Sequence, residues 1–186
     1  MLDRDLDLKI AVNRPSGYIN VKLGADKDGM ATVWVSHLWG SAGPTGGGVS
    51  VGVVPYVYRP KNNRRKFTPI RINAGPARAW RAPNHPQADL LTQTAYDDLA
   101  AKMGADSYDI FHKNLDNISS GQTADVYRRE MEIGAKLIGW KEKWHPHGKG
   151  KANGAVVEGL GMALHTWGGG ANTSSCQLKI HQDGSV

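Results

Sequence analysis

Residues 77–104 read ARAWRAPNHPQADLLTQTAYDDLAAKMG, and this stretch decides how the chain is organised. Its first ten residues are broken by proline and carry no regular hydrophobic spacing, which predicts a shaped loop. From Gln87 onward the pattern becomes helical, and Gly104 stands where a helix C-terminus favours glycine. We therefore predict a loop that carries Arg78 and Arg81 into a long helix. The apolar residues at helical spacing are Leu90, Leu91, Ala95, Leu99 and Met103.

Strand-like and helical segments flank this stretch. Residues 18–39 alternate apolar and polar side chains around the turn residues DKDG, which predicts a β-hairpin. The sequence of residues 40–65 predicts a loop. The sequence of residues 67–73 (FTPIRIN) predicts another strand. Downstream, SYDIFHKNL and TADVYRREMEIGAKLIGW predict two further helices. The inward positions that we expect in the last helix are Val126, Met131, Ile133 and Leu137.

The C-terminal third follows a polar connector, KEKWHPHGKGKANG, which we take as the boundary between two lobes. After it, AVVEGLGMALHTW predicts a strand or a buried, glycine-interrupted segment, and SCQLKIHQDGSV predicts a strand that runs into a tight turn. The whole pattern predicts an α+β fold with β-hairpins and with three helices between the two lobes. Both ends look cut, because the chain opens on a strand-like segment and stops at a turn.

Composition limits the classes of function. Lys and Arg number 23 against 17 Asp and Glu, which gives a net charge of +6. This charge could attract nucleic acid or an anionic cofactor. We favour a simpler interpretation, in which the charge is masked by partners in a larger protein. Cys176 is the single cysteine, so an intrachain disulfide and a four-cysteine metal site are excluded. The sequence has no membrane-spanning run and no targeting segment, so a cytoplasmic and a periplasmic location both stay open.

Arg81 is the residue most suited to chemistry. Prolines on both sides stiffen its loop, and Trp80 can fix the direction of the guanidinium by packing against a core. Such an arginine can bind an anionic substrate or stabilise charge that develops in a transition state. The simpler alternative is an ion pair with a surface carboxylate.

A series of landmarks follows residue 73. In order, they are Trp80-Arg81-Ala82-Pro83, Pro86-Gln87, Leu99-Ala100, Gly104, Asp106 and Lys113-Asn114-Leu115. This order resembles the molybdenum-binding subunit of the xanthine dehydrogenase and aldehyde oxidase family. In that family an aromatic-Arg-Gly-aromatic-Gly loop and a Pro-Gln pair lead into a helix and then into Leu-Ala, Gly, Asp and Lys-Asn-Leu landmarks. A weaker resemblance extends over nearly the whole chain.

The resemblance implies a piece of a larger enzyme. Members bind molybdopterin, in bacteria often as the cytosine dinucleotide, and hydroxylate aldehydes or N-heterocycles with oxygen from water. Iron–sulfur clusters and usually FAD lie on partner domains or subunits. The implied divisions are the end of a first molybdopterin-binding domain over 1–115, a helical connection over 116–153 and the start of a second such domain over 154–186. The remainder of the large subunit is then the main partner of the chain.

The resemblance also assigns roles to residues. Arg81 is implied as the catalytic residue beside the metal, and Trp80 and Ala82 as the residues that shape the cofactor pocket. Ala82 stands where carbon monoxide dehydrogenases of this family carry a copper-binding cysteine, which argues against that chemistry. The catalytic glutamate of the family lies beyond residue 186, so we do not assign that role to Glu158. The isolated chain is therefore expected to be inactive.

The departures from the family pattern are specific. The loop 82–85 (APNH) contains less glycine than is usual, so the pocket shape is expected to differ. Gln93 replaces a common glutamate, and Phe111 replaces a common arginine.

Glycine, histidine and basic clusters are weaker candidates. The triplet Gly168, Gly169 and Gly170 could present backbone N–H groups to a pyrophosphate, although a tight turn is the simpler interpretation. His145 and His147 lie on the connector and lack further ligands at metal-site spacing, so we predict no metal site. The basic run 61–66 beside two tyrosines leaves open a nucleic-acid-binding or assembly module without catalysis. We favour a solvated loop or a docking surface there, so nucleic acid is not an expected partner.

Overall fold

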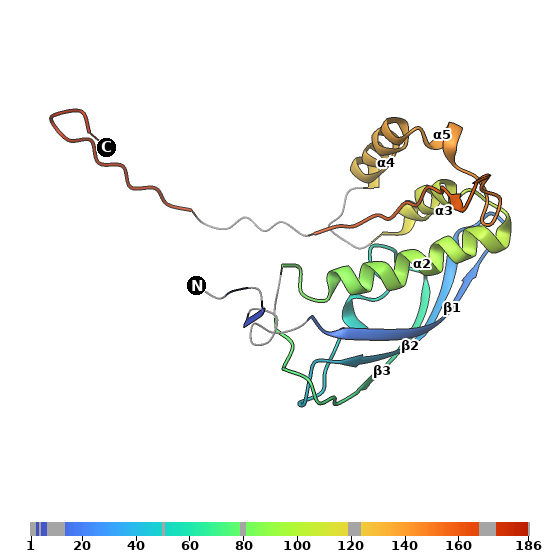
Figure 1. Ribbon diagram of the computed structural model, residues 1–186, viewed down its shortest axis with the longest axis horizontal. Coiled ribbons are helices and arrows are strands. Elements are labelled where there is room, and N and C mark those ends of the chain that lie inside the picture. Colours follow the sequence, from blue (N-terminus) through green and yellow to red (C-terminus); the bar gives the residue numbers. More distant parts are fainter. Residues whose placement is uncertain are drawn as a thin grey trace.

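A three-stranded sheet covered by helices forms the body of the protein. The computed structural model describes residues 3, 5–6, 14–49, 51–78, 81–118, 124–167 and 174–185. Within these, the sheet has the order β1-β2-β3, and helix α2 runs across one of its faces (Figure 1). The strands are β1 (Ser16–Ala25), β2 (Ala31–Ser41) and β3 (Asn62–Pro69). The helices are α2 (His85–Met103), α3 (Ser107–Asn114), α4 (Ala124–Ile138) and α5 (Trp140–Lys143), with short 3-10 turns η1 (Val51–Val53) and η2 (Leu115–Asn117).

Strands β1 and β2 cover the residues whose alternation predicted a hairpin. They pair antiparallel, with Leu23 opposite Trp34. The Asp26 carboxylate closes the connecting turn, because Oδ1 accepts hydrogen bonds from the N–H groups of Asp28 at 3.0 Å and Met30 at 2.9 Å. Trp34 is fully buried against α2, where its ring stacks on Tyr96 at 6.5 Å between centroids. The apolar face of β2 thus fixes the side of the sheet that α2 covers.

The prediction for the third strand was wrong at both ends. β3 begins at Asn62 and ends at Pro69, so it includes the basic run that was expected in a loop and stops short of residues 70–73. It pairs parallel with β2 at the edge of the sheet. An edge strand has one solvent-exposed side, where charged side chains are tolerated and oppose edge-to-edge association.

Helix α2 has the predicted C-terminus, and most of the predicted apolar positions pack against the core. Gly104 adopts φ 65° at the C-cap, and its N–H bonds to carbonyls of the last turn. Leu91, Ala95 and Leu99 are partly buried against the core, whereas Leu90 is 67% and Met103 38% exposed. Thr92 is buried because its hydroxyl accepts a hydrogen bond from the Tyr56 N–H at 2.8 Å. The buried face of α2 comprises Ala88, Thr92, Gln93, Tyr96 and Ala100.

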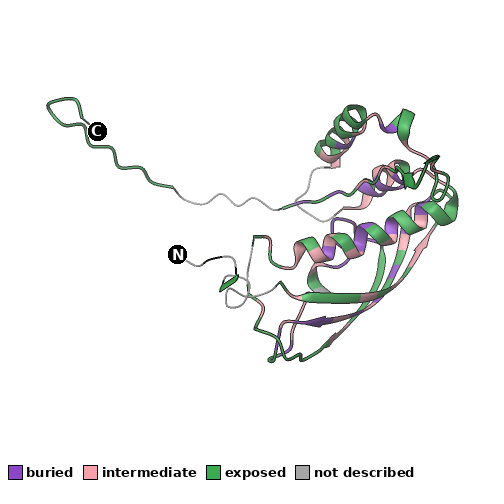
Figure 2. Ribbon diagram, viewed as in Figure 1, coloured by how far each residue is buried: buried purple, intermediate pink, exposed green. Residues whose placement is uncertain are grey.

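The inward face predicted for α4 is mostly wrong. Met131 is buried as expected, but Val126 is 50% exposed, Ile133 46% and Leu137 83%. Within the described residues, α4 packs mainly beside α5, η2 and α3. Its other side therefore has no covering layer in this part of the chain (Figure 2).

Asn114 ties α3 to the hairpin turn. Its Oδ1 accepts a hydrogen bond from the Ala31 N–H at 2.8 Å, and its Nδ2 donates to the carbonyls of Gly29 at 2.9 Å and Ile110 at 2.8 Å. The side chain is 1% exposed. Because α3 follows α2 closely, this contact holds the two helices at one end of the sheet.

The C-terminal third is extended rather than sheet-like. After the short pair β4 (Ala152–Asn153) and β5 (Val156–Val157), residues 158–167 have no regular structure, although Leu164 and Thr166 are buried. In the predicted strand and turn at 175–186, residues 175–181 are exposed and belong to no sheet, so the strand is wrong there (Figure 2). The tight turn is present, since the Gly184 N–H bonds to the His181 carbonyl at 2.9 Å. A strand needs a neighbour for its backbone hydrogen bonds.

No helix in the described part of the chain is both long enough and apolar enough to cross a bilayer.

Candidate functional site

Hydrogen bonds to backbone carbonyls hold the loop that precedes α2. Arg14, 67 residues away in sequence, donates a hydrogen bond from Nη2 to the Arg81 carbonyl at 2.7 Å. The His85 N–H donates to the Ala82 carbonyl at 3.1 Å, which closes a turn just as α2 begins. The Arg81 side chain is exposed. Its carbonyl is therefore fixed while its guanidinium is available to a ligand.

Two residues of this loop adopt backbone conformations that favour glycine. Ala82 has φ 54° and Asn84 has φ 66°. Non-glycine residues in this left-handed region are strained, and such strain concentrates at functional sites. The loop therefore keeps glycine-like geometry although it contains no glycine.

Glycine at either position is expected to be tolerated. We expect Ala82→Gly and Asn84→Gly to leave the free energy of unfolding unchanged or to raise it by up to about 1 kcal/mol, because each relieves a positive φ. The matched control, Ala88→Gly on the buried face of α2, should lower it by about 1 kcal/mol. Urea unfolding of the three variants measures the difference. Equal destabilisation by Ala82→Gly and Ala88→Gly would show that the loop is not strained.

A hollow of about 580 Å³ opens beside this loop. Its wall combines three segments that are distant in sequence: the residues before β1, the loop with the first turn of α2, and the extended segment 158–167. The surface of the hollow is mostly apolar. The described residues that line this Arg81 hollow are Arg14, Arg81, Ala82, Pro86, His165 and Trp167.

Aromatic rings support the wall of the hollow. Trp167 meets His85 edge-on, with 4.7 Å between centroids and 74° between planes. His85 in turn meets Tyr56 at 5.3 Å and 73°. Trp167 remains 57% exposed. A supported ring with an open surface can stack on a planar ligand.

Beside the hollow lies a partly buried polar cluster. Asp89 Oδ2 is 3.6 Å from His165 Nδ1, and the Asp89 side chain is 16% exposed. Burial raises the pKa of this carboxyl, and the charge of His165 opposes that rise. Gln93 Nε2 donates to the Leu164 carbonyl at 2.9 Å. These contacts fasten segment 158–167 to α2 and place His165 in the wall.

The predicted site residues have different outcomes. Arg81 and Ala82 lie together in the hollow, whereas Trp80 and the triplet 168–170 lie outside the described residues. His145 bonds to the Glu158 carbonyl at 2.9 Å. Across the described ranges, no three His, Cys, Asp or Glu side chains come together as metal ligands.

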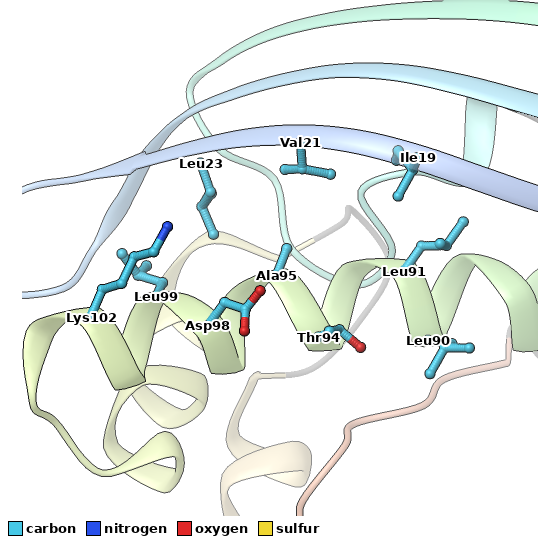
Figure 3. Close-up of a pocket in the computed structure, with 10 residues that line it drawn as sticks. All are labelled: Ile19, Val21, Leu23, Leu90, Leu91, Thr94, Ala95, Asp98, Leu99 and Lys102. Atoms are coloured by element: carbon cyan, nitrogen blue, oxygen red, sulfur yellow. The ribbon is translucent and has the colours of Figure 1, made fainter. Parts of the chain in front are cut away.

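A second hollow, of about 360 Å³, lies between β1 and the outer side of α2 (Figure 3). Figure 3 shows Ile19, Val21 and Leu23 pointing from β1 toward the helix. Its only charged lining residues among those described are Asp98 and Lys102. The Arg81 hollow, in contrast, has Arg14 and Arg81 among its described lining residues.

Comparison with known proteins defines the class. The profile of the molybdopterin cofactor-binding domain matches residues 1–115. The chain is 24% identical over 193 aligned residues to the aldehyde oxidoreductase molybdenum-binding subunit PaoC of Escherichia coli K12. That alignment covers 100% of this chain and 26% of PaoC.

Solved structures share the fold. Quinoline 2-oxidoreductase of Pseudomonas putida 86 matches with a TM-score of 0.60 and 14% identity, over 76% of this chain and 20% of the other. The aldehyde oxidoreductase of Desulfovibrio gigas matches with a TM-score of 0.51 and 22% identity, over 71% of this chain and 16% of the other.

The chain belongs to the molybdopterin cofactor-binding domain family, of the xanthine dehydrogenase and aldehyde oxidase type. It spans about a quarter of the curated relative, 26% of its length. The mixed α and β architecture agrees with this class.

Proposed function

We propose that this chain is part of the large subunit of a molybdenum hydroxylase that oxidises an aldehyde or an N-heteroaromatic compound with oxygen from water. The observation that carries the proposal is the Arg81 hollow, which Arg14, Arg81 and His165 help to line beside the N-terminus of α2. The names of the relatives support it, since one is an aldehyde oxidoreductase and another a quinoline oxidoreductase.

The residues of the hollow fit the cofactor chemically. Guanidinium groups bind phosphate and other oxyanions through paired donors, and Trp167 offers a face to a planar ring. The molybdenum cofactor supplies the redox chemistry when it is bound. In this proposal Arg81 orients the substrate and stabilises negative charge, while Trp80, Ala82 and the triplet 168–170 contact the cofactor. The cytosine dinucleotide form, and iron–sulfur and FAD groups on partner subunits, belong to the same proposal.

The domain divisions are also proposed. Residues 1–115 would end the first cofactor-binding domain, 116–153 would connect, and 154–186 would start the second. The remaining catalytic groups would then come from the rest of the large subunit. The alternative of a nucleic-acid-binding module is not favoured, because the family profile covers the basic run in β3.

A chimaeric subunit tests this function. We expect PaoC whose matched segment is replaced by this chain to reduce a dye with an aldehyde donor, whereas the isolated chain should give no turnover. Should the full replacement fail to fold, a second chimaera carrying residues 1–115 alone serves the same purpose. Both would be checked by circular dichroism. Folded chimaeras without aldehyde oxidation, or turnover by the isolated chain, would contradict the proposal.

A further inference from the structure

We propose that the face of the sheet opposite α2 is a docking surface for another protein, and that this partner presents carboxylates around an apolar centre. The outer face, as we call it, consists of alternate residues. They are the even-numbered ones from Tyr18 to Gly24 in β1, the odd-numbered ones from Val33 to Trp39 in β2, and the even-numbered ones from Asn62 to Thr68 in β3. The outer face shares no described residue with the Arg81 hollow.

The register of the strands fixes which residues share the outer face. Side chains of a strand point alternately to the two faces of a sheet. Ile19 and Leu23 point toward α2 (Figure 3), so the even-numbered residues between them point away from the helix. Trp39 pairs with Tyr18 on one side and with Thr68 on the other, so these three residues form one row across the sheet.

Apolar and aromatic side chains occupy the central strand of the outer face. Val33 and Val35 are each 37% exposed. The centroid of the Trp39 ring lies 5.7 Å from that of Tyr18 and 3.6 Å from that of His37. Tyr18 itself is 63% exposed. Apolar side chains gathered on one exposed face mark an interaction site.

A hydrogen bond holds His37 in place beside Trp39. His37 Nε2 lies 2.8 Å from Thr68 Oγ1. Burial and the charge of Lys66 lower the pKa of His37, so a neutral imidazole stacks on Trp39 at pH 7. Trp39 is therefore ordered before a partner arrives, which reduces the conformational entropy that binding costs. Tryptophan and tyrosine are the side chains that often carry most of the binding energy of an interface.

Positive charge flanks this centre on both sides. Lys22 of β1 and Arg64 of β3 pair with Val35 from its two sides, and Lys66 pairs with His37. All three cations are exposed. The structure describes every outer-face position, and none of them is acidic. A complementary partner therefore brings carboxylates opposite β1 and β3 and apolar side chains opposite β2.

A protein suits the outer face better than a nucleic acid or an anionic membrane. Single-stranded nucleic acid needs open ring faces for its bases, but His37 and Trp39 cover one face of each other's ring. Three cations are also few for a surface that binds chiefly through phosphate contacts. An apolar centre with a charged rim is instead the usual anatomy of a protein–protein interface.

Fluorescence anisotropy of labelled peptides, titrated with the whole chain, tests the chemistry of the partner. A short peptide of alternating Glu and Val represents its surface, and matched peptides replace Glu by Lys or Val by Ser. We expect the Glu–Val peptide to bind at low salt at least about tenfold more tightly than either matched peptide, and to weaken as salt rises. Absence of binding, or equal binding of the Lys–Val peptide, would overturn the proposal. Tighter binding of oligothymidylate or phosphatidylserine vesicles to the same face would overturn it as well.

Variants locate the binding on the outer face. Replacing both Arg64→Gln and Lys66→Gln should weaken the Glu–Val peptide about three- to tenfold. The pair Lys149→Gln and Lys151→Gln removes the same charge from exposed positions outside this sheet and should have little effect. Equal losses in the two double variants would place the binding elsewhere and overturn the proposal.

The aromatic row has its own readout. Trp39→Leu should weaken the Glu–Val peptide about tenfold, because an ordered aromatic anchor is lost. Tyr18→Ser, at a more exposed position, gives the same test if Trp39→Leu does not fold. Unchanged affinity in both variants, each shown to be folded by circular dichroism, would overturn the proposal. These measurements need neither cofactor nor turnover, so they can fail while the PaoC chimaera is active, and the reverse.

Discussion

Replacing Arg81 by alanine is expected to lower kcat/KM of the chimaeric enzyme by about 100- to 1000-fold, the usual cost of removing a donor that stabilises transition-state charge. The fold should survive, because the contact from Arg14 is made to the Arg81 carbonyl and not to its side chain. Steady-state kinetics with an aldehyde donor, together with the molybdenum content of each variant, measure the effect.

The loss in kcat/KM should depend on the geometry of the cation at position 81. Arg81→Lys keeps the charge but loses the planar fork of donors, so we expect intermediate activity. Arg71→Ala removes an exposed arginine outside the hollow and is the matched control. Equal activity of Arg81→Ala and Arg71→Ala at equal molybdenum content would remove Arg81 from the site.

Asn114→Leu is expected to destabilise the fold by about 3 kcal/mol, because buried backbone groups left without partners each cost about 1–3 kcal/mol. The substitution keeps the number and branching of side-chain heavy atoms but leaves the Ala31 N–H and the Gly29 carbonyl without the Asn114 side chain. Urea unfolding gives the magnitude. Asn63→Ala, in the exposed edge strand β3, should change stability by less than about 0.5 kcal/mol. A similar small change in Asn114→Leu would mean that the turn and α3 are not coupled.

Local patterns predicted the elements that depend on nearby residues. The spacing of apolar residues predicted helix α2. Its Gly104 cap was predicted because a helix C-terminus favours the left-handed backbone that glycine adopts easily. Leu91, Ala95 and Leu99 of the predicted apolar positions pack against the core. The burial of Thr92 and Gln93 rests on hydrogen bonds to distant segments, which periodicity does not reveal. The strand predicted within 175–186 is absent because no described strand pairs with this segment, and alternation alone does not supply a neighbour.

The candidate site was only half predictable. The loop and Arg81 were identified by resemblance to a family. Arg14, His165 and Trp167 join the hollow from segments far away in sequence, and no motif marks them. Asp89 looked like an ordinary polar position on a helix. The glycine-poor loop suggested a changed pocket, yet Ala82 and Asn84 take up the positive φ that glycine favours.

We propose that this chain holds a molybdopterin cofactor as part of a larger subunit. The pterin released from the purified PaoC chimaera, determined by fluorescence after oxidation and normalised to folded protein, tests this directly. We expect an occupancy close to that of PaoC itself. A chimaera that folds and assembles with its partner subunits but carries no pterin would contradict it.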